Sequence, residues 1–228
     1  MPTHDSAIAI MAKAPIPGSV KTRLVPLLTE QQAAQFSRAL LIDLLNSVKD
    51  FRAVEFYLFY SPVGTKDLMR ELAGYNFHLL PQRGGDLGAR MQAVFAELWS
   101  AGHRKIVLTG SDFPPFPLDF LAQAFAWLES SARRIVLGPS GDGGYYLIGM
   151  NQPTPEIFVD MTWSHDTVLV RTLEKLSVLN IETKQLPIWF DVDTPADFER
   201  LCSSQLASAA GSTHTFRFLQ GLGVLRLR

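Results

Sequence analysis

Hydrophobic residues follow two patterns along the chain, short apolar runs and longer segments with helical spacing. The short runs predict buried strands, because they are rich in aromatic and β-branched residues. These runs lie at residues 7–12, 54–60, 77–80, 105–109 and 135–139, and residues 182–186 are expected to be extended. Apolar positions three or four residues apart predict helices at residues 29–48, 66–72, 87–98, 118–128, 168–179 and 195–201.

The order of these segments predicts the architecture. Strands that alternate with helices form βαβ units around a mostly parallel sheet, so we expect an α/β fold with residues 1–202 as one domain. Thr29 and Gln32 match a capping box and indicate the start of the first long helix. Residues 203–228 are expected to form a polar linker and an apolar tail. The tail is expected to dock on a partner subunit, with a homodimer as the commonest outcome, or on the flank of its own domain.

Charge and cysteine content exclude several classes of function. The 21 Lys and Arg balance 22 Asp and Glu to a formal net charge of -1, which argues against binding to nucleic acid or to an anionic membrane. No apolar run approaches the roughly 20 residues of a membrane-spanning helix, and residues 1–6 do not resemble a secretory signal. Cys202 is the only cysteine, so no internal disulfide is expected. We therefore expect a cytoplasmic protein.

Polar clusters follow several of the predicted strands, where ligands bind in open parallel sheets. Lys13, Lys21 and Arg23 surround a Pro- and Gly-containing loop after the first strand. Such a loop is typical of a polyphosphate site, because Arg and Lys supply complementary contacts to phosphate. A solvated surface loop is the alternative. The loop is not a Walker A motif, because Lys21 does not directly follow Gly18.

Three aspartates lie in separate motifs, and each has two interpretations. Asp112 follows a strand, where a carboxylate suits Mg²⁺, but it could also form a turn or a helix cap. Asp193 precedes Thr-Pro, which is good capping chemistry without a ligand. Asp142 lies among three glycines that would let the backbone approach a ligand, and a hairpin turn at Asp142-Gly143 is the alternative. Trp163-Ser-His-Asp166 could add a stacking wall and a proton carrier, although a lone histidine is more often structural.

Six motifs occur in a fixed order: Lys13-Ala-Pro-x-Pro-Gly-x-Val-Lys-Thr-Arg-Leu24, Gly85-Asp-Leu-Gly-x-Arg-Met91, Gly110-Ser-Asp112, Gly141-Asp-Gly-Gly-Tyr-Tyr-Leu-Ile-Gly149, Trp163-Ser164 and Asp191-Val-Asp-Thr-Pro195. Over roughly residues 7–201, this order resembles a bacterial family of nucleotide-diphospho-sugar-transferase-like proteins of GT-A-type fold. Through its Lys-Thr-Arg-Leu loop and Asp-Thr-Pro segment, the chain is also distantly similar to phospholactate and phosphoenolpyruvate guanylyltransferases.

The resemblance implies a three-layer α/β/α sandwich whose mostly parallel mixed sheet binds a nucleotide at its carboxyl end. It implies that Asp112 and Asp193 hold Mg²⁺ or Mn²⁺, and that catalysis uses Asp112, Asp142 and Lys21. Nucleotide and phosphate contacts would come from Lys13, Gly18, Lys21, Arg23, Gln82, Gly85, Asp86 and Arg90. Acceptor contacts would come from Asp142, Gly143, Gly144, Tyr145 and Trp163.

One departure from the resemblance concerns the donor. Sugar nucleotidyltransferases have a glycine-rich loop after the first strand, whereas this chain has Pro15-Ile-Pro-Gly18, which offers fewer backbone N–H groups. The departure weakens the case for a free nucleoside triphosphate and leaves a nucleotide sugar open. The leading hypothesis is a metal-dependent transferase, favouring glycosyl transfer from a nucleotide sugar to a small acceptor. The alternatives are a nucleotidyltransferase that joins a nucleoside triphosphate to a phosphorylated small molecule, and a non-catalytic nucleotide-binding module.

Overall fold

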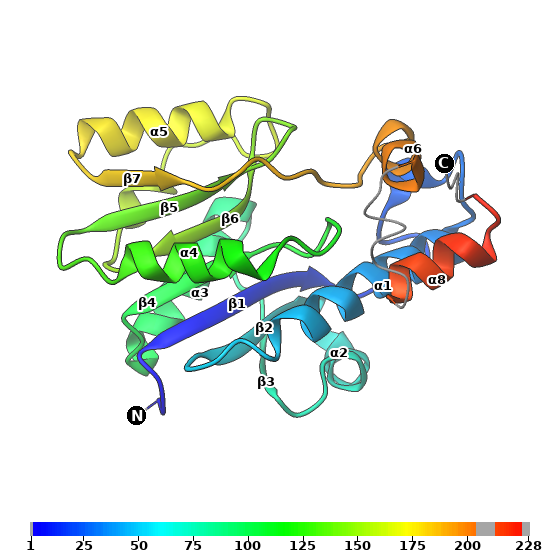
Figure 1. Ribbon diagram of the computed structural model, residues 1–228, viewed down its shortest axis with the longest axis horizontal. Helices are drawn as coiled ribbons and strands as arrows, with labels where there is room; N and C mark the ends of the chain where they lie inside the picture. Colours follow the sequence, from blue (N-terminus) through cyan, green and yellow to red (C-terminus); the bar gives the residue numbers. More distant parts are fainter. Residues whose placement is uncertain (1, 204–212, 225–228) are drawn as a thin grey trace.

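The computed structural model describes residues 2–203 and 213–224 and contains one seven-stranded sheet (Figure 1). The strands are β1 (Ser6–Lys13), β2 (Glu55–Ser61), β3 (Phe77–Pro81), β4 (Lys105–Thr109), β5 (Arg134–Pro139), β6 (Tyr145–Met150) and β7 (Glu182–Gln185). Their order across the sheet is β3-β2-β1-β4-β6-β5-β7, and only β6 runs antiparallel to its neighbours. The predicted mostly parallel mixed sheet is confirmed.

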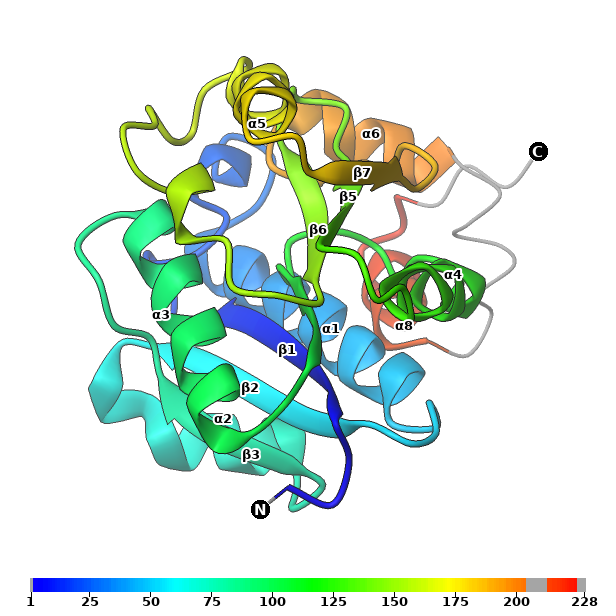
Figure 2. The same ribbon diagram turned by 90° about the vertical axis from the view of Figure 1, so that its left-hand side faces the viewer.

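Helices cover both faces of the sheet, which gives the predicted three layers (Figure 2). The helices are α1 (Glu30–Val48), α2 (Lys66–Ala73), α3 (Leu87–Ala101), α4 (Leu118–Leu128), α5 (Val168–Val178), α6 (Pro195–Ser203) and α8 (His214–Gly221). In β1, Ile8 and Ile10 face α1 and α4, while Ala7 and Ala9 face α3. Because both faces are covered, the strand is almost continuously apolar, as expected for a buried parallel strand.

Local sequence signals fix several element boundaries. The predicted capping box is confirmed, since the Thr29 hydroxyl accepts from Gln32 N at 3.2 Å and the Gln32 side chain accepts from Thr29 N at 2.9 Å. Strand β6 is not predicted by the sequence pattern, because it follows a glycine cluster and has no helical connection to β5. It forms a hairpin with β5 instead, and the turn between them contains Asp142 and Gly143. The hairpin turn at Asp142-Gly143 is therefore present, and Asp142 in that turn also lines the cavity described below.

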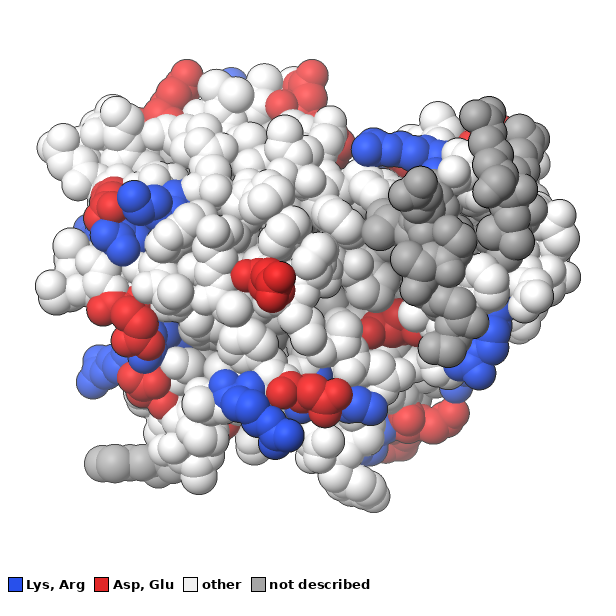
Figure 3. All heavy atoms as spheres, in the orientation of Figure 1, with Lys and Arg blue, Asp and Glu red and all other residues white. Residues whose placement is uncertain are grey.

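The strand order switches direction between β1 and β4. Chain connections lead from β1 to β2 on one side, and the return from β3 to β4 crosses to the other side. The carboxyl ends of β1 and β4 therefore lie at a switch in strand order, where open α/β sheets bind ligands. On the face shown in Figure 3, acidic and basic side chains are interspersed over a larger uncharged area. Within residues 2–203 and 213–224, none of the helices has both the length and the apolarity to cross a membrane.

The described part of the tail packs on the flank of its own domain. Helix α8 lies against α1 and α6 at the end of the molecule toward which β1 points (Figure 1). The Phe36 ring of α1 lies 5.6 Å from the Phe218 ring and 5.2 Å from the Phe198 ring, and Leu219 is fully buried. Residues 204–212 of the expected linker and residues 225–228 lie outside the described residues. The division at residue 203 and the homodimer stay predictions.

A buried carboxylate fixes the start of α8. The two Asp43 carboxylate oxygens accept hydrogen bonds from His214 N at 2.8 Å and from Thr215 N at 2.7 Å. A negative charge at these free N–H groups also interacts favourably with the helix dipole. We expect Asp43→Ala to lower the free energy of unfolding by about 2 kcal/mol, because it removes two hydrogen bonds to a charged group and leaves two N–H groups unpaired. Urea denaturation followed by circular dichroism measures this loss.

The matched control is Gln35→Ala, which changes an exposed residue of the same helix α1. This control is expected to stay within about 0.5 kcal/mol of the parent protein. An equal effect of both substitutions would contradict the anchoring role of Asp43.

Candidate active site

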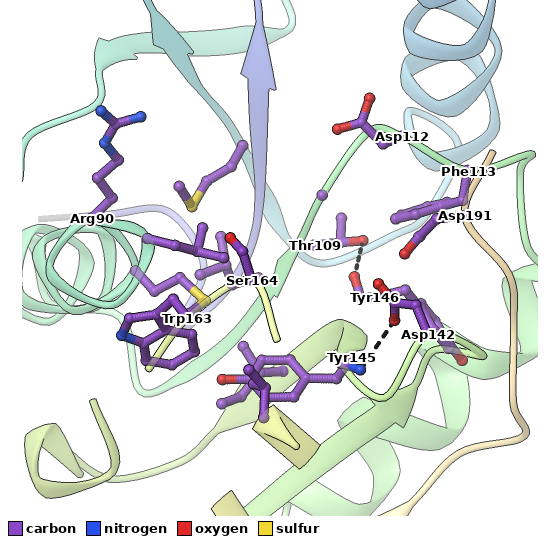
Figure 4. Close-up of a pocket in the computed structure, with 18 of the residues that line it drawn as sticks. Arg90, Thr109, Asp112, Phe113, Asp142, Tyr145, Tyr146, Trp163, Ser164 and Asp191 are labelled. Carbon is purple, nitrogen blue, oxygen red and sulfur yellow. Dashed lines mark hydrogen bonds between the residues drawn. The ribbon is translucent and has the colours of Figure 1, made fainter. Parts of the chain in front are cut away.

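A cavity of about 610 Å³ opens at the carboxyl ends of β1 and β4. The start of β6, the first turns of α3 and the loop that precedes α5 complete its wall. Figure 4 shows its lining, with Arg90 and Trp163 on one side, Asp112, Asp142 and Asp191 on the other, and Thr109 between them. The predicted clusters at the strand ends therefore meet in one place. The cavity has an aromatic and basic end and an acidic end.

Lys21 joins two of the three predicted aspartates. Its Nζ lies 2.8 Å from Asp112 Oδ1 and 2.8 Å from Asp193 Oδ1, and it donates to the Asp112 main-chain oxygen at 3.0 Å. Only 1% of the Lys21 side chain is exposed, whereas the two carboxylates are 60% and 45% exposed. Burial alone would lower the pKa of Lys21, but the two carboxylates outweigh it and raise that pKa. Lys21 is therefore a buried, positively charged group, and the carboxylates of Asp112 and Asp193 lie between it and the cavity. We call this arrangement the Lys21 clasp.

The three loops that form the Lys21 clasp are held by their own hydrogen bonds. Lys21 has left-handed backbone angles (φ 49°, ψ 34°) just before the short helix η1 (Thr22–Leu24). Val192 N donates to the Asp112 main-chain oxygen at 3.0 Å and so ties the loop after β4 to the segment before α6. The carboxylate of Asp197 caps α6 by accepting from Thr194 N at 2.8 Å. Because Asp197 performs the capping, the carboxylate of Asp193 is available to Lys21.

Asp191 is a lining residue that the sequence analysis did not assign to the site. Its Oδ2 accepts a hydrogen bond from Ser140 Oγ at 2.8 Å. Burial raises the pKa of Asp191 to about 7, and the negative charges of Asp142, Asp193 and Asp112 add to this effect. The sequence does contain a signal for Asp191, which is its spacing of two residues from Asp193. Residues two apart in an extended segment point to the same side, so both side chains could face one site. Four carboxyl groups thus share the acidic end of the cavity.

The glycines next to Asp142 serve the hairpin turn and its packing. Gly144 N donates to Asp142 Oδ1 at 3.0 Å, which closes a turn of the Asx type. Gly143 has φ 88°, and a Cβ there would lie 2.0 Å from the main-chain oxygen of Asp166. Only glycine therefore fits at position 143, because the loop before α5 approaches its backbone too closely for a side chain. Asp142 and Gly144 line the cavity, while Gly143 does not.

The donor-side predictions separate into lining and supporting residues. Lys13, Arg23, Gln82 and Arg90 line the cavity, and Gln82 Nε2 also bridges the main-chain oxygens of β1 and β2. Asp86 is the N-cap of α3, where it accepts from Ala89 N at 2.7 Å. Gly18, Gly85, Asp86 and Lys21 are not among the lining residues.

Trp163 lies at the basic end of the cavity, although the family resemblance implies a place on the acceptor side. Figure 4 shows its indole on the same side as Arg90 and away from Asp112 and Asp191. The indole packs directly on Gly88 in the first turn of α3, where a Cβ would lie 2.2 Å from Trp163 Nε1. Tyr145, also predicted on the acceptor side, lines the cavity near this end.

The donor set of the Lys21 clasp fits a divalent cation that is shared with a ligand. Mg²⁺ is commonly held by one or two carboxylates together with phosphate oxygens and water. Asp112 and Asp193 provide two such carboxylates, partly exposed toward the cavity. In the part of the chain that the structure describes, no group of three or more His, Cys, Asp or Glu is arranged to hold a metal ion.

The contact between Gly88 and Trp163 allows a test of how the Trp163 indole is held at the basic end of the cavity. We expect Gly88→Ala to push the indole out of its position and to lower the free energy of unfolding by about 1–3 kcal/mol, as overpacking does. Urea denaturation followed by tryptophan fluorescence measures both effects. Gly85→Ala is the matched control, because a Cβ there meets no atom within 4 Å. Equal stability of the two variants would show that Trp163 does not need the gap at Gly88.

Similar proteins share both the sequence pattern and the fold. A family model described as "Uncharacterized protein conserved in bacteria (DUF2064)" matches residues 44–165. The crystal structure of a candidate nucleotide-diphospho-sugar transferase from Desulfovibrio desulfuricans G20 is 30% identical, with a TM-score of 0.91 and 98% coverage of each chain. No curated protein matches the sequence.

Two nucleotide-using enzymes share the fold at lower identity. The inositol-1-phosphate CTP transferase from T. maritima is 18% identical, with a TM-score of 0.50 over 85% of this chain and 91% of that chain. The CMP:2-keto-3-deoxy-manno-octonic acid synthetase complexed with CTP is 12% identical, with a TM-score of 0.51 over 86% of this chain and 96% of that chain. At these identities the likeness shows the fold alone. The match of the family model and the 30% identity over nearly the whole chain show that this protein belongs to the DUF2064 family of bacteria.

Proposed function

We propose that the protein is a metal-dependent transferase that moves a glycosyl group from a nucleotide sugar to a small acceptor. The observation that carries the proposal is the Asp112–Asp193 pair beside a cavity of about 610 Å³ at the switch in strand order. That position is where open α/β sheets bind nucleotides. The crystal structure from Desulfovibrio desulfuricans G20, 30% identical, supports the same class of reaction.

The donor would lie between the basic end and the Lys21 clasp. Lys13, Arg23 and Arg90 line the cavity and supply cationic contacts for a diphosphate. The indole of Trp163 offers a flat apolar surface for the base or the ribose. Asp112 and Asp193 would hold a Mg²⁺ or Mn²⁺ ion, which would neutralise charge on the departing diphosphate.

The acidic end of the cavity supports a neutral acceptor. Asp142 and Asp191 contribute two carboxyl groups there in addition to the pair that would hold the metal. A phosphorylated acceptor would place negative charge against these groups, whereas a hydroxyl could donate a hydrogen bond to Asp142. In the proposed reaction the acceptor oxygen forms a bond to the anomeric carbon, the bond from that carbon to the diphosphate oxygen breaks, and Asp142 takes the hydroxyl proton. The same charge argument weighs against nucleotidyl transfer to a sugar phosphate.

The metal pair is tested by removing one charge at a time. We expect Asp112→Asn and Asp193→Asn each to abolish Mn²⁺-dependent binding of the nucleotide, because each removes one of the two anionic ligands. A thermal-shift screen of nucleotide sugars and nucleoside triphosphates, with and without Mn²⁺, identifies the donor, and calorimetry then measures its affinity. Circular dichroism checks that both variants fold. Unchanged metal dependence in both variants would contradict the pair.

The acceptor role of Asp142 is tested separately. We expect Asp142→Asn to keep donor affinity within about twofold and to reduce transfer by a factor of about 10²–10⁴, as loss of a general base does. Release of the nucleoside diphosphate, measured with neutral and phosphorylated sugars as acceptors, gives the rate. Weaker donor binding in this variant would place Asp142 on the donor side. Release of pyrophosphate from a nucleoside triphosphate with a phosphorylated sugar would favour nucleotidyl transfer, and binding without any turnover would favour a non-catalytic module.

A further inference from the structure

The two aspartates make three close polar contacts with the Lys21 ammonium. An ammonium group has three N–H donors. Here Nζ donates hydrogen bonds to Asp193 Oδ1 at 2.8 Å and to the Asp112 main-chain oxygen at 3.0 Å, and it forms an ion pair with Asp112 Oδ1 at 2.8 Å. The side chain is 1% exposed and is not among the lining residues of the cavity. In this structure Lys21 is therefore a counter-ion of the carboxylate pair and does not project into the space for a ligand.

This arrangement places one positive charge where a divalent cation would need the same oxygens. Mg²⁺ binds carboxylate oxygens at about 2.1 Å. Because each Oδ1 lies 2.8 Å from Nζ, an ion bound to either Oδ1 would lie within about 5 Å of the ammonium, and like charges that close repel. An ion bound only through the Oδ2 atoms of Asp112 and Asp193 would be separated from the Lys21 ammonium by a single carboxylate group. The two positive charges would still repel each other at that separation. Both geometries make the metal and Lys21 competitors for Asp112 and Asp193.

We propose that the Lys21 ammonium is an internal competitor of the divalent cation, so that Asp112 and Asp193 bind the metal tightly only when a donor phosphate takes over the ammonium. This inference rests on the proposed function, because it takes Asp112 and Asp193 as the metal pair. On this inference, Lys21 determines that the metal ion binds tightly only together with the donor phosphate. Lys21 is then not a permanent phosphate contact.

The need for a phosphate follows from the burial of Lys21. A buried ammonium that loses both carboxylates without a new partner is strongly unfavourable. A new anion must therefore reach it when the metal enters. Arg23, which lies in the same turn as Lys21, lines the cavity. Phosphates held by Arg23 would thus arrive beside the segment that carries Lys21. Metal and phosphate would then strengthen each other's binding, as linkage between two ligands requires.

The first test measures Mn²⁺ binding without any nucleotide, by the loss of the free Mn²⁺ signal in electron paramagnetic resonance. We expect Lys21→Met to bind Mn²⁺ at least tenfold more tightly than the unsubstituted protein, because the competing charge is gone. Lys13→Met is the matched control, since it removes an equal charge from the lining of the same cavity without touching the pair. The control is expected to change Mn²⁺ affinity less than threefold. Circular dichroism checks folding, and Lys21→Gln provides a second, polar replacement.

The double variant Lys21→Met with Asp112→Asn separates the two proposals. Loss of the added Mn²⁺ affinity in the double variant, after a gain in Lys21→Met, supports the competition. Unchanged or weaker binding in Lys21→Met, while Asp112→Asn still reduces binding, overturns the competition and leaves the metal pair intact. If Asp112→Asn leaves Mn²⁺ affinity unchanged both in the unsubstituted protein and in Lys21→Met, the metal pair and the competition are both overturned.

A second test needs no substitution of Lys21. Thermal unfolding of the full chain is measured with Mn²⁺ alone, with inorganic pyrophosphate alone and with both. The competition predicts that both together raise the melting temperature by more than the two separate shifts combined, and that Asp112→Asn removes this excess. Shifts that simply add in the unsubstituted protein overturn the proposal.

Discussion

The ion pairs of Lys21 with Asp112 and Asp193 connect the three loops on which the site depends. These loops follow β1, β4 and β7, and they are separated by 91 and 172 positions along the chain. Two separate carboxylates so close together would repel each other without a cation. The buried ammonium supplies that cation and so gives the acidic end of the cavity its shape in the absence of a ligand. The exposure of the two carboxylates, 60% and 45%, leaves them accessible from the cavity.

The other walls of the cavity are positioned by the strand order and by two places where a loop packs directly against the backbone of a glycine. The switch between β1 and β4 opens the cavity, and the antiparallel hairpin of β5 and β6 brings Asp142 to its rim. The bare backbones of Gly143 and Gly88 then let the loop before α5 come close on two sides, through Asp166 and Trp163. One loop thereby closes the wall between the acidic and basic ends.

Much of the fold could be predicted from the sequence because its signals are local. Helical spacing, buried apolar runs and the capping box at Thr29 each depend on neighbouring residues, and these predictions are confirmed. Strand β6 was beyond such signals, because its pairing with β4 and β5 depends on contacts across the sheet. The docking of α8 on α1 likewise depends on Asp43, which lies 171 positions before His214. A local pattern carries no information about such distant partners.

The candidate site shows the same division between local and distant signals. The motifs identified Asp112, Asp142 and Asp193, because strand ends and glycine clusters can be recognised in the sequence. They did not reveal that Lys21 is buried between two of these aspartates, that the half-buried Asp191 accepts a hydrogen bond from Ser140, or that Trp163 lies on the side of Arg90. Each of these features results from the meeting of loops that are far apart in the sequence.

The most direct measurement is the anomalous scattering of Mn²⁺ in crystals soaked with Mn²⁺ and pyrophosphate. We expect one strong peak in contact with both Asp112 and Asp193, and we expect Lys21 Nζ to have left the two carboxylates for a phosphate oxygen. A peak bound elsewhere in the cavity, or no peak with Lys21 still between the two aspartates, would contradict the competition between the metal ion and Lys21.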